Sequence, residues 1–94
     1  MFDLPPELIQ KYITRRVQDI DVLSQALKKD DIEVFQRIGH QIAGNAVNYG
    51  MDSLEKIGRN MESLKSENFK NEAKNLLDSY TAEVNKYKNI FSKV

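Results

Sequence analysis

The spacing of the apolar residues is the feature that most constrains the fold of this chain. In four segments, apolar side chains recur at every third or fourth position, which is the period that places them on one face of an α-helix. The last segment is the longest and is predicted to be one helix from Phe69 to Phe91. Its apolar face comprises Phe69, Ala73, Leu76, Tyr80, Val84, Tyr87 and Phe91. Because short connections make neighbouring helices antiparallel, the sequence predicts an all-α fold, an antiparallel up-down four-helix bundle.

The first helix is predicted to begin at Pro5-Pro6, because proline suits the first helical turn, and to reach about Lys29. Its apolar stripe comprises Ile9, Ile13, Val17, Ile20, Leu23 and Leu27. Leu8 and Tyr12 widen the stripe at its start. A bend near residues 14–16 would therefore set off a short N-terminal helical extension from the rest of the helix.

Acidic residues and a glycine delimit the second and third helices. Asp30-Asp31, followed by Glu33, resembles a capping box and predicts a second helix from Ile32 to about Tyr49. Gly50 is expected to end it in the left-handed conformation. A third helix is predicted to start at Asp52 and to end before the break at residues 66–68. Its apolar residues are Leu54, Ile57, Met61 and Leu64.

Size and composition exclude several classes of protein. The chain has 94 residues, and we expect one domain over residues 1–94. It has no cysteine, which excludes a disulfide scaffold and a thiolate metal site. Its formal net charge of zero argues against nucleic-acid binding, and no apolar run is long enough to span a membrane. We expect a soluble, cytoplasmic, monomeric helical domain that binds neither nucleic acid nor membrane.

The single histidine, His40, lies in the second predicted helix. At 100° per residue, it is opposite the apolar residues at 35, 38, 42, 46 and 49, so it is expected at the middle of the solvent face. It shares that face with Glu33, Gln36, Arg37, Ala43, Gly44 and Val47. An exposed histidine can be an idle surface residue or a reactive one, and its position on the helical wheel alone does not decide between them.

The neighbours of His40 favour a surface on which another molecule docks. Gly44 lies one turn after His40, where a side chain would cover the imidazole, and a glycine inside a helix costs roughly 1 kcal/mol relative to alanine. Ala43 and Val47 keep the adjacent surface low and partly apolar. Gly39 lies nearer the core face, so tight packing against another helix explains it better than docking does.

The residues from His40 to Gly50 resemble the active helix of histidine-containing phosphotransfer (HPt) domains. In that pattern a histidine is followed by a lysine, a glycine, small residues and a second glycine. His40, Gly44, Ala46 and Gly50 match, and the resemblance extends from about Leu8 to Tyr87. Outside this helix, the residues that fit the family are Asp30, Leu54 and the pair Met61-Glu62. The family's lysine is replaced by Ala43.

The resemblance implies a phosphorelay intermediate rather than an enzyme. His40 would accept a phosphoryl group from the aspartate of a response-regulator or hybrid-kinase receiver domain and pass it to another receiver. The chain would need no cofactor, since the receiver would bind the Mg²⁺. The residues expected to contact the receiver or the phosphoryl group are Arg37, Gln36, Gln41, Ala43, Gly44 and Val47. Arg37 is either a substitute for the missing lysine or an ordinary solvated arginine.

Two classes of function stay open from the sequence. Ala43 favours a non-catalytic bundle that docks on a receiver or a kinase without carrying phosphate, whereas His40 with Gly44 and Gly50 favours the carrier. Other classes lack their residues. A di-iron bundle needs two Glu-x-x-His pairs, and the chain has one histidine. The spacing of Gly39 and Gly44 is that of a phosphate-binding loop, but the lysine that should follow is Asn45.

Overall fold

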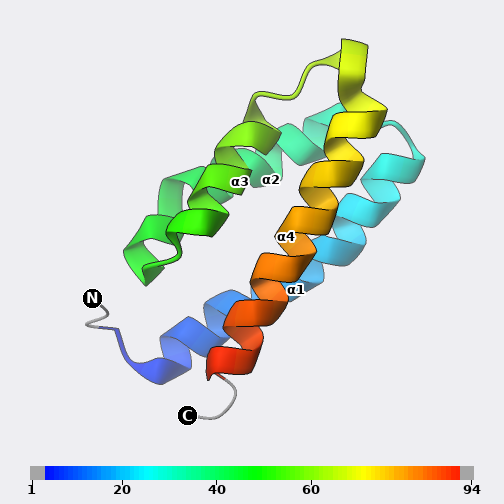
Figure 1. Cartoon of the computed structure of the whole chain (residues 1–94). Helices are drawn as coiled ribbons and strands as arrows, with labels where there is room; N and C mark the ends of the chain where they lie inside the picture. The colour runs from blue at the N-terminus through cyan, green and yellow to red at the C-terminus, as the bar shows by residue number, and fades with distance from the viewer. Residues whose placement is uncertain (1–3, 92–94) are drawn as a thin grey trace.

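Four α-helices and two short 3₁₀ turns make up the computed structural model, which describes residues 4–91 (Figure 1). The elements are α1 (Pro6–Lys28), α2 (Ile32–Asn45), η1 (Ala46–Tyr49), α3 (Asp52–Glu62), η2 (Ser66–Asn68) and α4 (Phe69–Phe91). The helices pack antiparallel, and no strand occurs in this range. The all-α four-helix prediction is therefore confirmed. The expected domain limits, 1 and 94, lie outside the described residues.

The bundle consists of two pairs of helices. The long helices α1 and α4 lie side by side, and the shorter α2 packs most closely on α3 (Figure 1). At the end of the long pair, the Gln10 side-chain amide donates a hydrogen bond to the carbonyl oxygen of Phe91 at 3.0 Å. The N-terminal part of α1 is thus held by α4, which leaves α2 and α3 to form the other side of the molecule.

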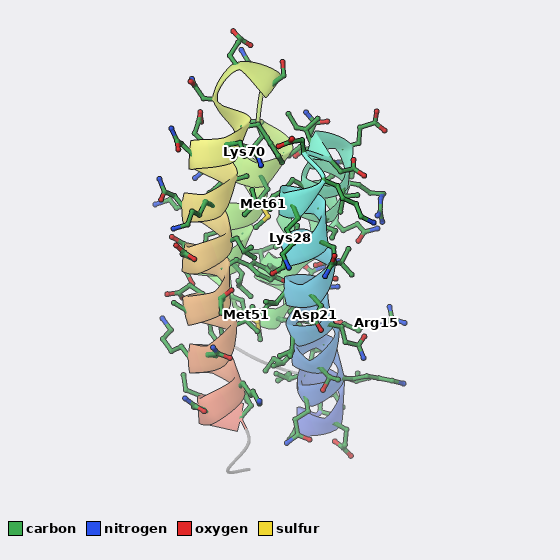
Figure 2. The ribbon with its side chains drawn as sticks, turned by 90° about the vertical axis from the view of Figure 1, so that its right-hand side faces the viewer. Arg15, Asp21, Lys28, Met51, Met61 and Lys70 are labelled. Carbon is green, nitrogen blue, oxygen red and sulfur yellow. The ribbon has the colours of Figure 1, made fainter. Side chains whose placement is uncertain are left out.

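Apolar residues from all four helices form one core. Its largest fully buried side chains are Tyr80, Phe35, Leu23, Ile42, Met51, Leu54, Met61 and Val84. In Figure 2, Met51 and Met61 appear between the ribbons of α1 and α4. Leu76 is half-buried and packs against this core, as predicted, but Leu77, which was left out of the predicted apolar face of α4, is buried in it. None of the helices within residues 4–91 is long and apolar enough to cross a membrane.

The first helix is uninterrupted, so the expected bend near residues 14–16 was wrong. The expectation rested on the widening of the apolar stripe by Leu8 and Tyr12. Arg16, however, is buried, with 7% of its surface exposed, and its Nε lies 2.8 Å from an oxygen of Asp19. Because Arg16 occupies a core-facing place, the buried face of α1 continues through residues 14–16 without a break.

The start of α2 at Ile32 is confirmed, but its N-terminal capping and its last turn differ from the predicted ones. Asp31 is the N-cap residue but makes no capping hydrogen bond. Asp30 has a positive φ of 55°, and its carboxylate pairs with Lys70 of α4 at 3.1 Å, so the capping box is not formed. The α-helix ends at Asn45 and continues to Tyr49 as η1. Gly50 follows with φ 71°, which confirms the predicted left-handed residue.

Candidate functional site

His40 lies on the solvent face of α2, as the helical wheel predicts. Its side chain is 76% exposed, whereas Phe35 and Ile42, on the opposite face of the same helix, are fully buried. The core thus fixes the rotation of α2 and directs the imidazole outward. His40 is thus accessible to solvent among the residues that the structure describes.

Glu62, at the end of α3, holds the imidazole of His40. The Nδ1 atom of His40 lies 2.5 Å from Oε2 of Glu62, and the carboxylate side chain is 43% exposed. An ionised carboxylate can only accept a hydrogen bond, so in the neutral ring Nδ1 carries the proton. The lone pair is then on Nε2, the nitrogen that is free to react with an incoming electrophile.

Two glycines bring α3 close enough for this contact. A Cβ atom built on Gly39 would lie 2.5 Å from the carbonyl oxygen of Gly58 and 2.7 Å from the backbone nitrogen of Glu62. One built on Gly58 would lie 2.9 Å from the backbone nitrogen of Ala43. The backbones of α2 and α3 therefore touch, and the packing explanation for Gly39 is confirmed. Gly58 was not identified from the sequence; a glycine inside a helix as short as α3 was the available signal.

Gln36 also links α2 to the end of α3. Its side-chain amide donates a hydrogen bond to the carbonyl oxygen of Leu64, just beyond α3, at 2.9 Å. The residue is half-buried. Its amide group is therefore directed toward α3, one turn before His40, and supports the position of Glu62.

On the C-terminal side of His40, few side chains project from the surface. A Cβ atom added to Gly44 would meet no atom within 4 Å, and Ala43 is half-buried. Val47 is 48% exposed. The structure thus places Gly44 and Val47 on the exposed face with His40 and leaves open space above the glycine.

Arg37 and Gln41 lie on the side of His40 that faces α1. Both are exposed. Burial raises the pKa of the Asp19 carboxyl in α1, and the positive charges of Arg16 and Arg37 oppose that shift. The charge of Arg37 therefore interacts with the carboxyl group of Asp19 in α1. Gln41 lines a groove between α1 and α2. The cation expected near the phosphoryl group is therefore on the α1 side, away from Glu62.

A polar network fixes α1 against α2 beneath this surface. The Tyr12 hydroxyl donates a hydrogen bond to the Asn45 side chain at 2.5 Å, and the rings of Tyr12 and Tyr49 stack with centroids 3.9 Å apart. Tyr80 of α4 donates to the Arg16 carbonyl and to Asp19, each at 3.1 Å. The half-buried Asn45 side chain thus has a hydrogen-bond partner. The burial of Arg16 was missed, although it lies on the apolar side of α1.

Within residues 4–91, no three histidine, cysteine, aspartate or glutamate side chains are close enough together to hold a metal ion. The site is one exposed imidazole with a defined tautomer, a carboxylate on one side and cations on the other. Such an arrangement suits a nucleophile that reacts with a group brought by a partner.

Comparison with known proteins agrees with this geometry. The Hpt domain family matches residues 7–89, which include all four helices almost to the end of α4. A search of curated proteins and a search of solved structures each gave no match. The match covers most of the chain, and the chain therefore belongs to the Hpt domain family.

Proposed function

We propose that Nε2 of His40 accepts a phosphoryl group from the phosphorylated aspartate of a receiver domain and passes it to a second receiver. Membership of the Hpt family implies a role in phosphotransfer within a phosphorelay. The observation that carries the assignment to His40 is its contact with Glu62 on the exposed face of α2. The direction of transfer from one receiver to the next is part of the proposal.

The contact with Glu62 suits both halves of the reaction. The Nε2 lone pair attacks phosphorus, an N–P bond forms, and the P–O bond to the receiver aspartate breaks to leave a carboxylate. The ring keeps its proton on Nδ1 and becomes positively charged. The Glu62 carboxylate, 2.5 Å from Nδ1, balances that charge. Onward transfer reverses these steps at a second aspartate, so the imidazole returns to its neutral form.

The surroundings of His40 leave room for a receiver. The open space above Gly44 and the exposed Val47 side chain form the floor of the proposed contact, with Ala43 beside them. Arg37 and Gln41 contribute polar groups on the α1 side. Gln36 acts indirectly, since its bond to the Leu64 carbonyl positions α3 and hence Glu62.

The receiver completes the chemistry. In this proposal the chain itself binds no cofactor, and the Mg²⁺ that neutralises phosphoryl charge is held by the receiver. We further propose that residues 1–94 form a single domain and that it works as a monomer in the cytoplasm, where receiver domains and their kinases meet.

Labelling with phosphorylated receivers tests the proposal. Receiver domains charged with radioactive acetyl phosphate are mixed with the chain, and transferred label is tested for the acid lability and base stability of phosphohistidine. We expect such label on the natural chain and none on His40→Gln, whose helical circular dichroism should be unchanged. Label retained by His40→Gln would exclude His40 as the acceptor.

Ala43 favours one other function, a bundle that docks on a receiver or kinase without carrying phosphate. It occupies the position of the family's lysine, and it is half-buried against Gly58. Titration calorimetry with the same receivers distinguishes the two functions. Saturable binding without any transfer of label would support the non-catalytic bundle.

A further inference from the structure

A groove of about 400 Å³ runs between α1 and α2 beside the face that carries His40. Its floor contains the stacked rings of Tyr12 and Tyr49 and the side chain of Asn45. These groups are held together by the stack and by the hydrogen bond from Tyr12 to Asn45. The groove is thus built into the packing of the two helices and does not depend on a mobile side chain for its shape.

The rim of the groove carries uncompensated positive charge. Lys11 and Arg15 line it from α1. Both are exposed, and neither belongs to any of the salt bridges found within residues 4–91. Figure 2 shows Arg15 extending from α1 away from the bundle. Arg16 also lines the groove, but its charge is balanced by Asp19 at 2.8 Å. The surplus therefore comes from Lys11 and Arg15.

The two sides of His40 differ in charge. On the α3 side, the nearest group is the Glu62 carboxylate. One turn earlier in α3, Arg59 is paired with Glu55 at 3.1 Å. On the α1 side, Gln41 follows His40 directly in the chain and lines the groove. A partner that bears negative charge around its reactive group is thus attracted toward α1 and repelled by Glu62.

We propose that the Lys11–Arg15 rim binds the acidic surface around the active site of the receiver, so that the receiver approaches His40 over the seam between α1 and α2. This inference rests on the proposed function. A receiver that binds Mg²⁺ presents carboxylates beside its phosphorylated aspartate, because Mg²⁺ sites are built from oxygen ligands. Complementary charge raises the rate of association. Lys11 and Arg15 therefore determine how fast, and with which receivers, the chain reacts.

Neutralising the rim tests the proposal. The variant is Lys11→Gln with Arg15→Gln, since glutamine has a similar helix propensity. The matched control is Lys56→Gln with Lys88→Gln, which removes two exposed charges from α3 and α4 that, like those of the rim, belong to none of these salt bridges. The probe is a receiver domain charged with acetyl phosphate, chosen because it labels the natural chain. Second-order transfer rates are measured by quench-flow at low and at high salt, and each chain is also phosphorylated with phosphoramidate, a small donor that does not dock.

We expect the rim variant to accept phosphate about five- to tenfold more slowly at low salt, with a difference from the natural chain that shrinks at high salt. The control variant should keep at least half of the natural rate, and all three chains should react equally with phosphoramidate. Equal slowing in the rim and control variants, or slowing that salt does not change, would overturn the inference and leave the proposed function standing. If no receiver labels His40, both the proposed function and this inference are contradicted.

Discussion

At the scale of single residues, Glu62 determines which nitrogen of His40 can react. Glu62→Gln keeps an oxygen that can accept the Nδ1 proton but removes the charge that balances a positive ring. We expect uptake from a phosphorylated receiver to slow about three- to tenfold, a loss of about 1 kcal/mol, because a pair this exposed is partly screened by water. Quench-flow measures the rate, and Glu55→Gln is the control, since Glu55 pairs with Arg59. Equal rates for the natural chain and Glu62→Gln would remove Glu62 from the mechanism.

Ala43 is the residue at which this chain departs from its family. A lysine at this position lies one turn from His40 and could reach a phosphoryl group on Nε2, a contact worth about 0.5–1.5 kcal/mol at an exposed site. We expect Ala43→Lys to lengthen the half-life of phosphohistidine or to speed uptake several-fold, with a gain that shrinks at high salt. Stability to urea should change little.

Arg37→Ala shows whether an existing cation already fills that role. Arg37 lies one turn before His40, and its positive charge interacts with the carboxyl group of Asp19 in α1. If Ala43→Lys brings no gain and Arg37→Ala slows transfer, Arg37 is the substitute. If neither variant changes transfer, the idea that a cation at position 37 or 43 stabilises the phosphoryl group is left without support.

At the scale of the helices, the close approach of α2 and α3 is what creates the site. Gly39→Ala would place a methyl group 2.5 Å from a backbone oxygen of α3, and backbone cannot move aside as a side chain does. We expect a loss of about 1–3 kcal/mol in the free energy of unfolding by urea. Phosphoryl uptake should also slow, because Glu62 is displaced from His40.

Gly44→Ala is the matched control for Gly39→Ala. It lies in the same helix but has open space above it, so alanine should stabilise the protein by about 0.5–1 kcal/mol. Equal effects of the two substitutions would show that the α2–α3 contact is looser than the structure indicates.

The helix scale also shows what the sequence could predict. Apolar spacing predicts each helix because periodicity is a local property, and Gly50 marks a local turn. Leu76 and Leu77 lie 100° apart around the helix axis, and which of them is buried more deeply depends on how α4 rotates against its neighbours, which spacing does not determine. The capping role expected of Asp30 failed for a similar reason, since Lys70, distant in the chain, pairs with its carboxylate.

At the scale of the whole molecule, contacts between helices distant in sequence were the part that could not be predicted. The wheel placed His40 on the surface, but it could not bring Glu62 to Nδ1, because that contact depends on the distance between α2 and α3. Gly58 sets that distance and was not recognised. The burial of Arg16 could not be predicted from apolar spacing, because it depends on its partners, Asp19 and Tyr80. These are the contacts that turn a generic bundle into this site.

Tyr80 joins α4 to α1 and makes the stability of the whole bundle depend on pH. Its side chain is fully buried, and its hydroxyl donates to the Arg16 carbonyl and to Asp19. Burial and then the negative charge of Asp19 raise the pKa of Tyr80 well above its ordinary value of 10.0. The folded protein therefore keeps this proton at a pH where the unfolded chain loses it. The stabilisation is complete below pH 10 and declines as the pH rises above it.

Tyr80→Phe tests this coupling. At neutral pH we expect the variant to lose about 1–3 kcal/mol of unfolding free energy, because Asp19 and the Arg16 carbonyl lose a donor. Above pH 10, the natural protein should lose stability more steeply than the variant, by up to about 1.4 kcal/mol per pH unit for this one group. Urea unfolding followed by circular dichroism between pH 7 and about 11 gives both slopes. Parallel curves would mean that Tyr80 ionises as readily in the folded bundle as in the unfolded chain, which its burial and its two hydrogen bonds argue against.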